Sequence, residues 1–127
     1  MRHHFKSLKV WQVGMDLVVS VYAITKEYPK EERYGLVSQI NRSVVSVPSN
    51  IAEGSGRNTD KYFSKYLTQS LGSLYELETQ IIVSLRLNFI SENKFEEIMK
   101  VINELKKMLI GFINKINSVK EHLNSNV

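Results

Sequence analysis

Apolar side chains recur every three or four residues along almost the whole chain, and this spacing restricts the fold more than any other feature. In the first segment with this spacing, the apolar or small residues are Val10, Gly14, Leu17, Val21, Ile24 and Tyr28. Such a spacing places them on one face of an α-helix. Three further segments show the same spacing, and no segment alternates as a strand does. The sequence therefore predicts an all-α fold.

Proline, asparagine and hydroxyl residues predict where the helices begin and end. Pro29 ends the first helix, because a proline pushes the residue before it out of helical geometry. Asn58 or Thr59 caps the third helix, Asn88 closes it in left-handed geometry, and Ser91 caps the fourth. The predicted helices cover residues 8–28, 31–54, 59–88 and 92–120, in a single domain of residues 1–127. Short turns between such helices favour an antiparallel up-down-up-down four-helix bundle.

Pro48 lies inside the second predicted helix, where a proline removes one backbone hydrogen bond and costs about 3 kcal/mol. The apolar spacing nevertheless continues in phase across it, at Ile40, Val44, Val47 and Ile51. We therefore predict one continuous helix, kinked at Pro48. The carbonyl of Val44, which loses its partner, is expected to bond a serine hydroxyl, a water or a neighbouring helix.

The glycines that follow Pro48 could be read as a phosphate-binding loop. However, the GSGR segment lacks the third glycine of a dinucleotide-binding motif, and no lysine-serine pair or preceding strand is present. We predict that Gly54 and Gly56 instead end the second helix in left-handed geometry.

Polar residues form a further stripe along the second predicted helix, at Gln39, Arg42, Ser46, Ser49 or Asn50, Glu53 and Arg57. This stripe is interpreted as a solvated surface, a contact face or a buried hydrogen-bond network. In the third helix, Glu78 falls among apolar positions, and a buried carboxylate needs a partner. We predict that Glu78 is mostly buried and pairs with Arg42.

The pattern YGLVSQINRSVVSVPSNIAEGSGR, followed by LGSLYELETQ, resembles the four-helix-bundle family of 23S rRNA-intervening-sequence proteins, also called the S23 ribosomal protein family. The resemblance covers about residues 5 to 117. The family's signature falls on Gly35, Leu36, Gln39, Arg42, Pro48, Asn50, Ile51, Glu53, Gly54, Arg57, Gly72, Ser73, Glu76 and Glu78.

The same family is similar to the accessory proteins of diversity-generating retroelements, which form basic pentameric barrels that work with a reverse transcriptase and nucleic acid. The resemblance thus implies a ring-forming bundle without known catalysis. This chain departs from the retroelement proteins in one respect, since its formal net charge of +4 is modest and theirs is strongly basic.

Residues suited to catalysis are scarce. The chain has no cysteine, and its three histidines, His3, His4 and His122, all lie near the ends. Glu76 and Glu78 are two residues apart and so point to different faces of a helix. We therefore expect no enzymatic activity, no cofactor and no metal site. No apolar run approaches the roughly 20 residues that span a bilayer, so we expect a soluble, cytoplasmic protein without a membrane partner.

Two kinds of binding function remain. In the first, the chain associates with RNA or DNA through phosphate contacts from Arg2, Lys6, Lys9, Arg33, Arg57 and Lys61. Tyr34 and Tyr62 could then stack on unpaired bases, or they could serve ordinary packing between helices. In the second, the chain is a protein–protein interaction adaptor, and its basic charge has no role.

The first predicted helix carries a second apolar stripe, formed by Trp11, Met15, Val18 and Tyr22. A four-helix bundle buries only about one third of each helix's circumference, so this stripe would form an exposed patch. A neighbouring subunit is the simplest cover for it, and the sequence therefore predicts a homo-oligomer. The number of subunits, five, is implied only by the family resemblance.

Overall fold

The computed structural model describes residues 4–125, and it describes side chains as far as residue 118. Within this range the chain forms four α-helices, two short 3-10 helices and no strand. The elements are η1 (Phe5–Ser7), α1 (Lys9–Thr25), η2 (Lys30–Glu32), α2 (Leu36–Ser55), α3 (Asp60–Arg86) and α4 (Glu92–Ser125).

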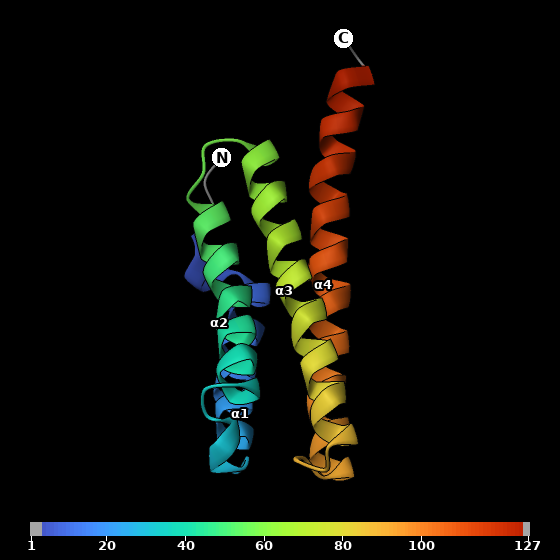
Figure 1. The fold of residues 1–127 in the computed structure, drawn as a ribbon. Helices are drawn as coiled ribbons and strands as arrows, with labels where there is room; N and C mark the ends of the chain where they lie inside the picture. The colour runs from blue at the N-terminus through green and yellow to red at the C-terminus, as the bar shows by residue number, and fades with distance from the viewer. Residues whose placement is uncertain (1–3, 126–127) are drawn as a thin grey trace.

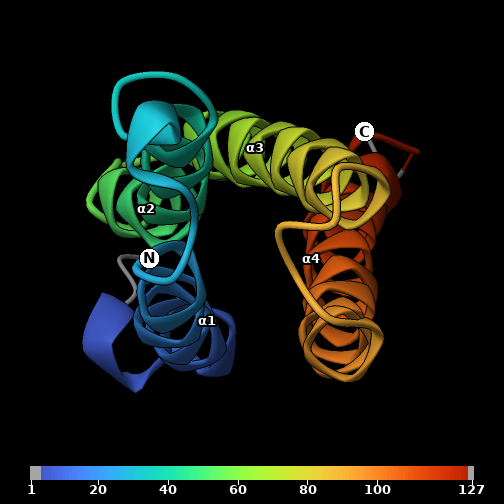
Figure 2. The ribbon, with the colours of Figure 1, turned by 60° about the horizontal axis from the view of Figure 1, so that its bottom comes forward.

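In the view of Figure 1 the four helices run down, up, down and up, so each helix is antiparallel to the next. Helices consecutive in sequence lie side by side, whereas α1 and α4 lie further apart and leave the bundle more open between them (Figure 2). The predicted all-α bundle is therefore confirmed. We call the end where α2 turns into α3 the α2–α3 end, and the opposite end the α3–α4 end.

The predicted caps are present in α3 and α4. Thr59 accepts a hydrogen bond from the backbone N–H of Tyr62 (3.3 Å), and the hydroxyl of Ser91 accepts one from that of Lys94 (3.2 Å). Asn88, with φ of 61°, has the predicted left-handed geometry after α3. Local sequence signals therefore locate three of these helix ends.

Two predicted boundaries in the first half of the chain differ from the structure. α1 ends at Thr25, three residues before the predicted end, and α2 begins at Leu36 rather than at residue 31. The segment between them contains the separate turn η2 and the buried side chain of Tyr28. The apolar spacing thus continues to Tyr28 because that side chain fills the core, although the backbone has already left the helix.

α2 continues without a break through Pro48, so the prediction of a continuous helix is confirmed. A bend at this residue stays a prediction. Gly14 of α1 faces the proline ring, and a Cβ at Gly14 would lie 3.5 Å from Pro48 Cβ. The buried hydroxyl of Ser70 donates to the carbonyl of Val47 (2.8 Å), one residue before the proline, and the expected partner of the Val44 carbonyl stays a prediction.

The prediction of left-handed glycines after Pro48 is wrong. Among the described residues no glycine has a positive φ, and Gly56 has φ of −83°. Gly54 is required instead by close packing, because a Cβ there would lie 2.7 Å from Tyr66 Cβ and 3.0 Å from Phe63 Cδ1. Its lack of a side chain lets α3 pack directly against the last turn of α2.

The core of α3 is broader than one stripe of helical spacing. Among its apolar positions three and four residues apart, Phe63, Leu67, Leu74 and Ile81 are buried, whereas Leu71 and Leu85 are partly buried and pack against the core. Leu77 is also fully buried, as are Ser70 and Ser84. The physical reason is that α3 packs against α2 on one side and α4 on the other, so two adjoining strips of its surface are covered (Figure 2).

Candidate assembly and nucleic-acid interface

An exposed apolar patch lies on the outer side of α1 and α2. Its members are Met15 (39% exposed), Val19 (69%), Tyr22 (46%) and Val45 (39%), and we call it the α1–α2 face. The three residues from α1 are spaced four and three apart and so lie on one side of that helix. Large apolar side chains gathered in this way are typical of a contact surface.

The α1–α2 face includes only part of the predicted oligomer stripe. Met15 and Tyr22 are exposed, whereas Trp11 and Val18 are partly buried and pack against the core. The Trp11 ring also meets the edge of the Phe5 ring, with centroids 5.3 Å apart. Sequence reasoning missed Val19 and Val45, although Val19 shares the helical spacing of Met15 and Tyr22.

A groove of about 710 Å³ adjoins the α1–α2 face. It is lined by Tyr22, Arg33, Tyr34, Val37, Ser38, Asn41, Arg42, Val45, Ser46 and Ser49. The small serines of α2 in this lining leave room for another helix to approach. Within the described residues Arg42 makes no hydrogen bond or ion pair, and the Arg33 guanidinium lies 5.6 Å from the centre of the Tyr34 ring. The groove therefore offers cationic, aromatic and apolar groups together.

The family-motif residues do not gather into one site. Gln39, Arg42, Glu53, Gly72 and Glu76 are exposed, whereas Pro48 and Gly54 are buried where helices meet. Gly35 and Asn50 are partly buried, and the Asn50 side chain donates to the carbonyl of Ser46 (2.9 Å). The motif is thus partly a packing signature and partly an exposed surface.

The predicted pairing of Glu78 with Arg42 is wrong. The Glu78 carboxylate accepts a hydrogen bond from the Lys106 ammonium group at 2.7 Å, and both side chains are about one fifth exposed. Glu78 therefore lies between α3 and α4, on the side of α3 away from α2. The sequence could not choose between basic partners, because Glu78 and Lys106 are 28 residues apart along the chain and their pairing depends on the register between α3 and α4.

The predicted phosphate contacts divide between the two ends of the bundle. Lys61 lies in the first turn of α3 at the α2–α3 end, while Arg33 follows η2 at the opposite end (Figure 1). Lys6 and Lys9 lie in or beside η1, whose Phe5 lines a hollow with Gly56 and Arg57 near the end of α2. Arg2 lies outside the described residues.

The Arg57 side chain binds other side chains of the same chain. Its guanidinium bonds to the Glu53 carboxylate and donates to the Tyr66 hydroxyl (2.8 Å), and it lies 5.0 Å from the centre of the Tyr66 ring. These contacts join the end of α2 to the start of α3. Arg57 therefore stabilises a turn, and its charge is partly neutralised by Glu53.

The described part of the chain contains no cluster of three or more histidine, aspartate or glutamate residues that could hold a metal ion. His3 and the side chain of His122 lie outside that part. A hollow of about 560 Å³ between α1 and α4 is lined mostly by apolar residues, with Glu27, Lys94 and Glu97 as its charged members. None of the helices described is both long and apolar enough to cross a membrane.

The fold and this surface define an antiparallel four-helix bundle with an exposed apolar face. The family described as 23S rRNA-intervening sequence protein matches the chain over residues 6–111, and the chain belongs to this family. A crystal structure of a protein of unknown function from the S23 ribosomal protein family of Bacteroides thetaiotaomicron VPI-5482 is similar, with a TM-score of 0.77 and 25% sequence identity. The similarity covers 82% of this chain and 97% of that one. No curated protein matches the sequence.

Proposed function

We propose that this chain is a non-catalytic, self-assembling scaffold that associates with RNA or another nucleic acid. The observation that supports assembly is the exposed α1–α2 face, in which Val19 is 69% exposed. Burying such a patch against another subunit stabilises the assembly by about 25 cal/mol for each Å² removed from water. A closed ring follows if different surfaces of successive subunits meet, and five subunits are favoured by the family resemblance.

Light scattering at micromolar concentration tests the assembly. The wild-type chain is expected to give the mass of a closed oligomer, and Val19→Glu is expected to lower that mass by placing a charge in the contact. Val83→Glu is the matched control, because Val83 of α3 is also exposed (39%) and lies outside the α1–α2 face. A monomeric wild-type chain would overturn the proposal.

The nucleic-acid association is supported by the net positive charge and by exposed lysines that make no ion pair within the described structure. We expect non-specific retention on structured RNA, with micromolar or weaker affinity. Because phosphate contacts release counterions, binding should fall steeply between about 50 and 200 mM salt.

The alternative function is a protein–protein interaction adaptor without a nucleic-acid role. The groove beside the α1–α2 face favours it, since cationic, aromatic and apolar groups together suit a protein partner. Absence of RNA retention at 50 mM salt in an oligomeric wild-type protein would support the adaptor. A cytoplasmic location, expected from the cysteine-free sequence, stays a prediction.

A further inference from the structure

Charge is unevenly distributed along the bundle. The α2–α3 half, taken as residues 4–12, 46–78 and 104–118 so that the paired Glu78 and Lys106 lie in the same half, carries eight lysines and arginines and five carboxylates. The remaining described residues before 119 carry seven basic and seven acidic side chains. The α2–α3 half therefore holds the positive charge of the described chain, and a polyanion would be drawn to it.

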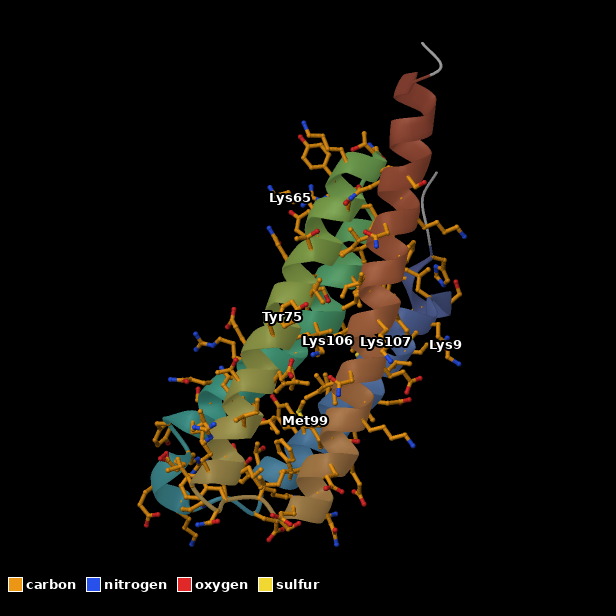
Figure 3. All side chains as sticks on the ribbon, turned by 90° about the vertical axis from the view of Figure 1, so that its right-hand side faces the viewer. Lys9, Lys65, Tyr75, Met99, Lys106 and Lys107 are labelled. Atoms are coloured by element: carbon orange, nitrogen blue, oxygen red, sulfur yellow. The ribbon has the colours of Figure 1, made fainter. Side chains whose placement is uncertain are left out.

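Five exposed lysines of this half form what we call the basic face: Lys9 from α1, Lys61 and Lys65 from α3, and Lys107 and Lys115 from α4. None of them makes an ion pair or hydrogen bond within the described residues. Seen from the α4 side, the labelled Lys65, Lys107 and Lys9 are spread across the width of the bundle (Figure 3).

The register between α3 and α4 decides at which level of the bundle these lysines lie. Ser64 donates a hydrogen bond to the Asn117 side chain (3.0 Å), which places Lys61 and Lys65 at the level of Lys115. Further down, the bond from Lys106 to Glu78 places Lys107 near the level of Tyr75. Because Lys61 and Lys65 are one helical turn apart, they are separated by about 6 Å along the axis.

An exposed aromatic ring lies beside the basic face. Tyr75 of α3 is 48% exposed, and the ammonium group of Lys106 lies 5.5 Å from the centre of its ring. Lys106 is held there by Glu78, so it orients the ring without adding net charge. One turn before Tyr75, Gly72 has no atom within 4 Å of the place its Cβ would occupy. A ligand can therefore approach the α3 backbone closely at this point.

We propose that the basic face binds the phosphate backbone of single-stranded nucleic acid, with an unpaired base stacked on Tyr75. This inference rests on the proposed function and places its nucleic-acid site on α3 and α4, so that it keeps Lys61 from the predicted phosphate contacts and leaves out Arg33 and Arg57. Phosphates contact Lys61, Lys65, Lys107 and Lys115, and a planar base covers the Tyr75 ring. Because most of the basic face lies on α3 and α4, assembly through the α1–α2 face leaves it accessible (Figure 2).

The test compares two triple variants of the full chain on the same helices. Lys61→Gln/Lys65→Gln/Lys107→Gln removes three charges from the basic face. Arg86→Gln/Lys94→Gln/Lys100→Gln removes three exposed charges from the same two helices near the α3–α4 end. Binding to a fluorescent single-stranded oligouridylate is measured from 50 to 200 mM salt, and light scattering checks that both variants keep the wild-type mass.

Each phosphate contact with a single strand contributes about 0.7 to the slope of log K against log salt. The basic-face variant should therefore reduce the magnitude of that slope by about 2, whereas the control variant should keep the wild-type slope. Equal losses in the two variants would overturn the location of the site while leaving the scaffold and its RNA association in place. A wild-type oligomer that retains structured RNA but binds no oligouridylate at 50 mM salt would overturn the single-strand site. One that binds neither RNA at 50 mM salt would overturn the nucleic-acid association itself.

Tyr75 provides a second, independent readout. Tyr75→Ala is expected to weaken binding to the single strand roughly 5- to 150-fold, the range typical of one lost stacking contact, with a much smaller effect on duplex RNA. Tyr75→Phe keeps the ring and should bind nearly as the wild type does. An alanine variant that binds the single strand as tightly as the phenylalanine variant would overturn the stacking role.

Discussion

Two glycine-to-alanine substitutions of identical chemistry should change stability in opposite directions. Gly54 packs against α3, where a Cβ would lie 2.7 Å from Tyr66 Cβ and 3.3 Å from the carbonyl oxygen of Phe63. Gly72 lies inside α3 with nothing within 4 Å of the same position. The sequence alone gives no reason to distinguish them.

The loss of stability expected for Gly54→Ala follows from the geometry of the contacts around Gly54. A Cβ cannot rotate away, so the two helices must separate by roughly 1 Å to reach the ordinary 3.5–4.0 Å contact distance. That movement strains the buried hydrogen bond from Ser70 to Val47 and loosens the fully buried side chains beside it. Overpacking of this kind costs about 1–3 kcal/mol, and the rigid contact places Gly54→Ala near the upper value.

The substitution also gains helix propensity, by at most about 1 kcal/mol. We therefore expect Gly54→Ala to lower the free energy of unfolding by about 2 kcal/mol, and Gly72→Ala to raise it by about 1 kcal/mol. For a chain of this size these changes shift Tm by about −8 °C and +4 °C.

Thermal unfolding followed by circular dichroism measures both shifts. All three proteins are compared at one concentration, because oligomerisation makes Tm depend on concentration. If Gly54→Ala were as stable as the wild type, the close approach of α2 and α3 would not be the reason for glycine at this position.

Three further outcomes follow from the described contacts. Lys106→Met should destabilise the fold by about 1–2 kcal/mol in urea denaturation, because it leaves the partly buried Glu78 carboxylate without its partner. Arg42→Ala should change stability by less than about 0.5 kcal/mol. Equal losses of stability in the two variants would support Arg42 as the partner of Glu78. Pro48→Ala should stabilise the chain by about 1–2 kcal/mol, because it returns a backbone hydrogen bond to α2 although it loses the contact with Gly14. A loss of stability would show that the contact with Gly14 outweighs the missing hydrogen bond. Burial raises the pKa of the Tyr28 hydroxyl, an effect that the nearby Ser84 hydroxyl partly offsets. As pH rises, Tyr28 therefore ionises first in the unfolded chain, and the free energy of unfolding should fall through and above about pH 10. Tyr28→Phe should reduce this loss of stability at high pH, and an unchanged loss would assign it to other groups.

The sequence by itself determined the helical class, the number of helices and most of their ends. These features depend on side chains a few residues apart. The 3.6-residue period, the caps at Thr59 and Ser91 and the left-handed Asn88 are read within one or two turns of backbone. The continuous helix through Pro48 was also predictable, because the apolar phase on its two sides is a local property.

Only the tertiary structure decided which residues distant in sequence meet. Glu78 pairs with Lys106 because α3 and α4 adopt one register, and a shift of one turn would have offered the carboxylate a different neighbour. Gly54 is needed by the approach of α3, so its role could not be read from a pattern that equally suits a helix end. The same packing buries part of the predicted assembly stripe at Trp11 and Val18 and exposes Val19 beside it. Lysines from three helices likewise share the α2–α3 half of the bundle because antiparallel packing aligns opposite halves of α3 and α4, and charges spaced along a sequence carry no record of that alignment.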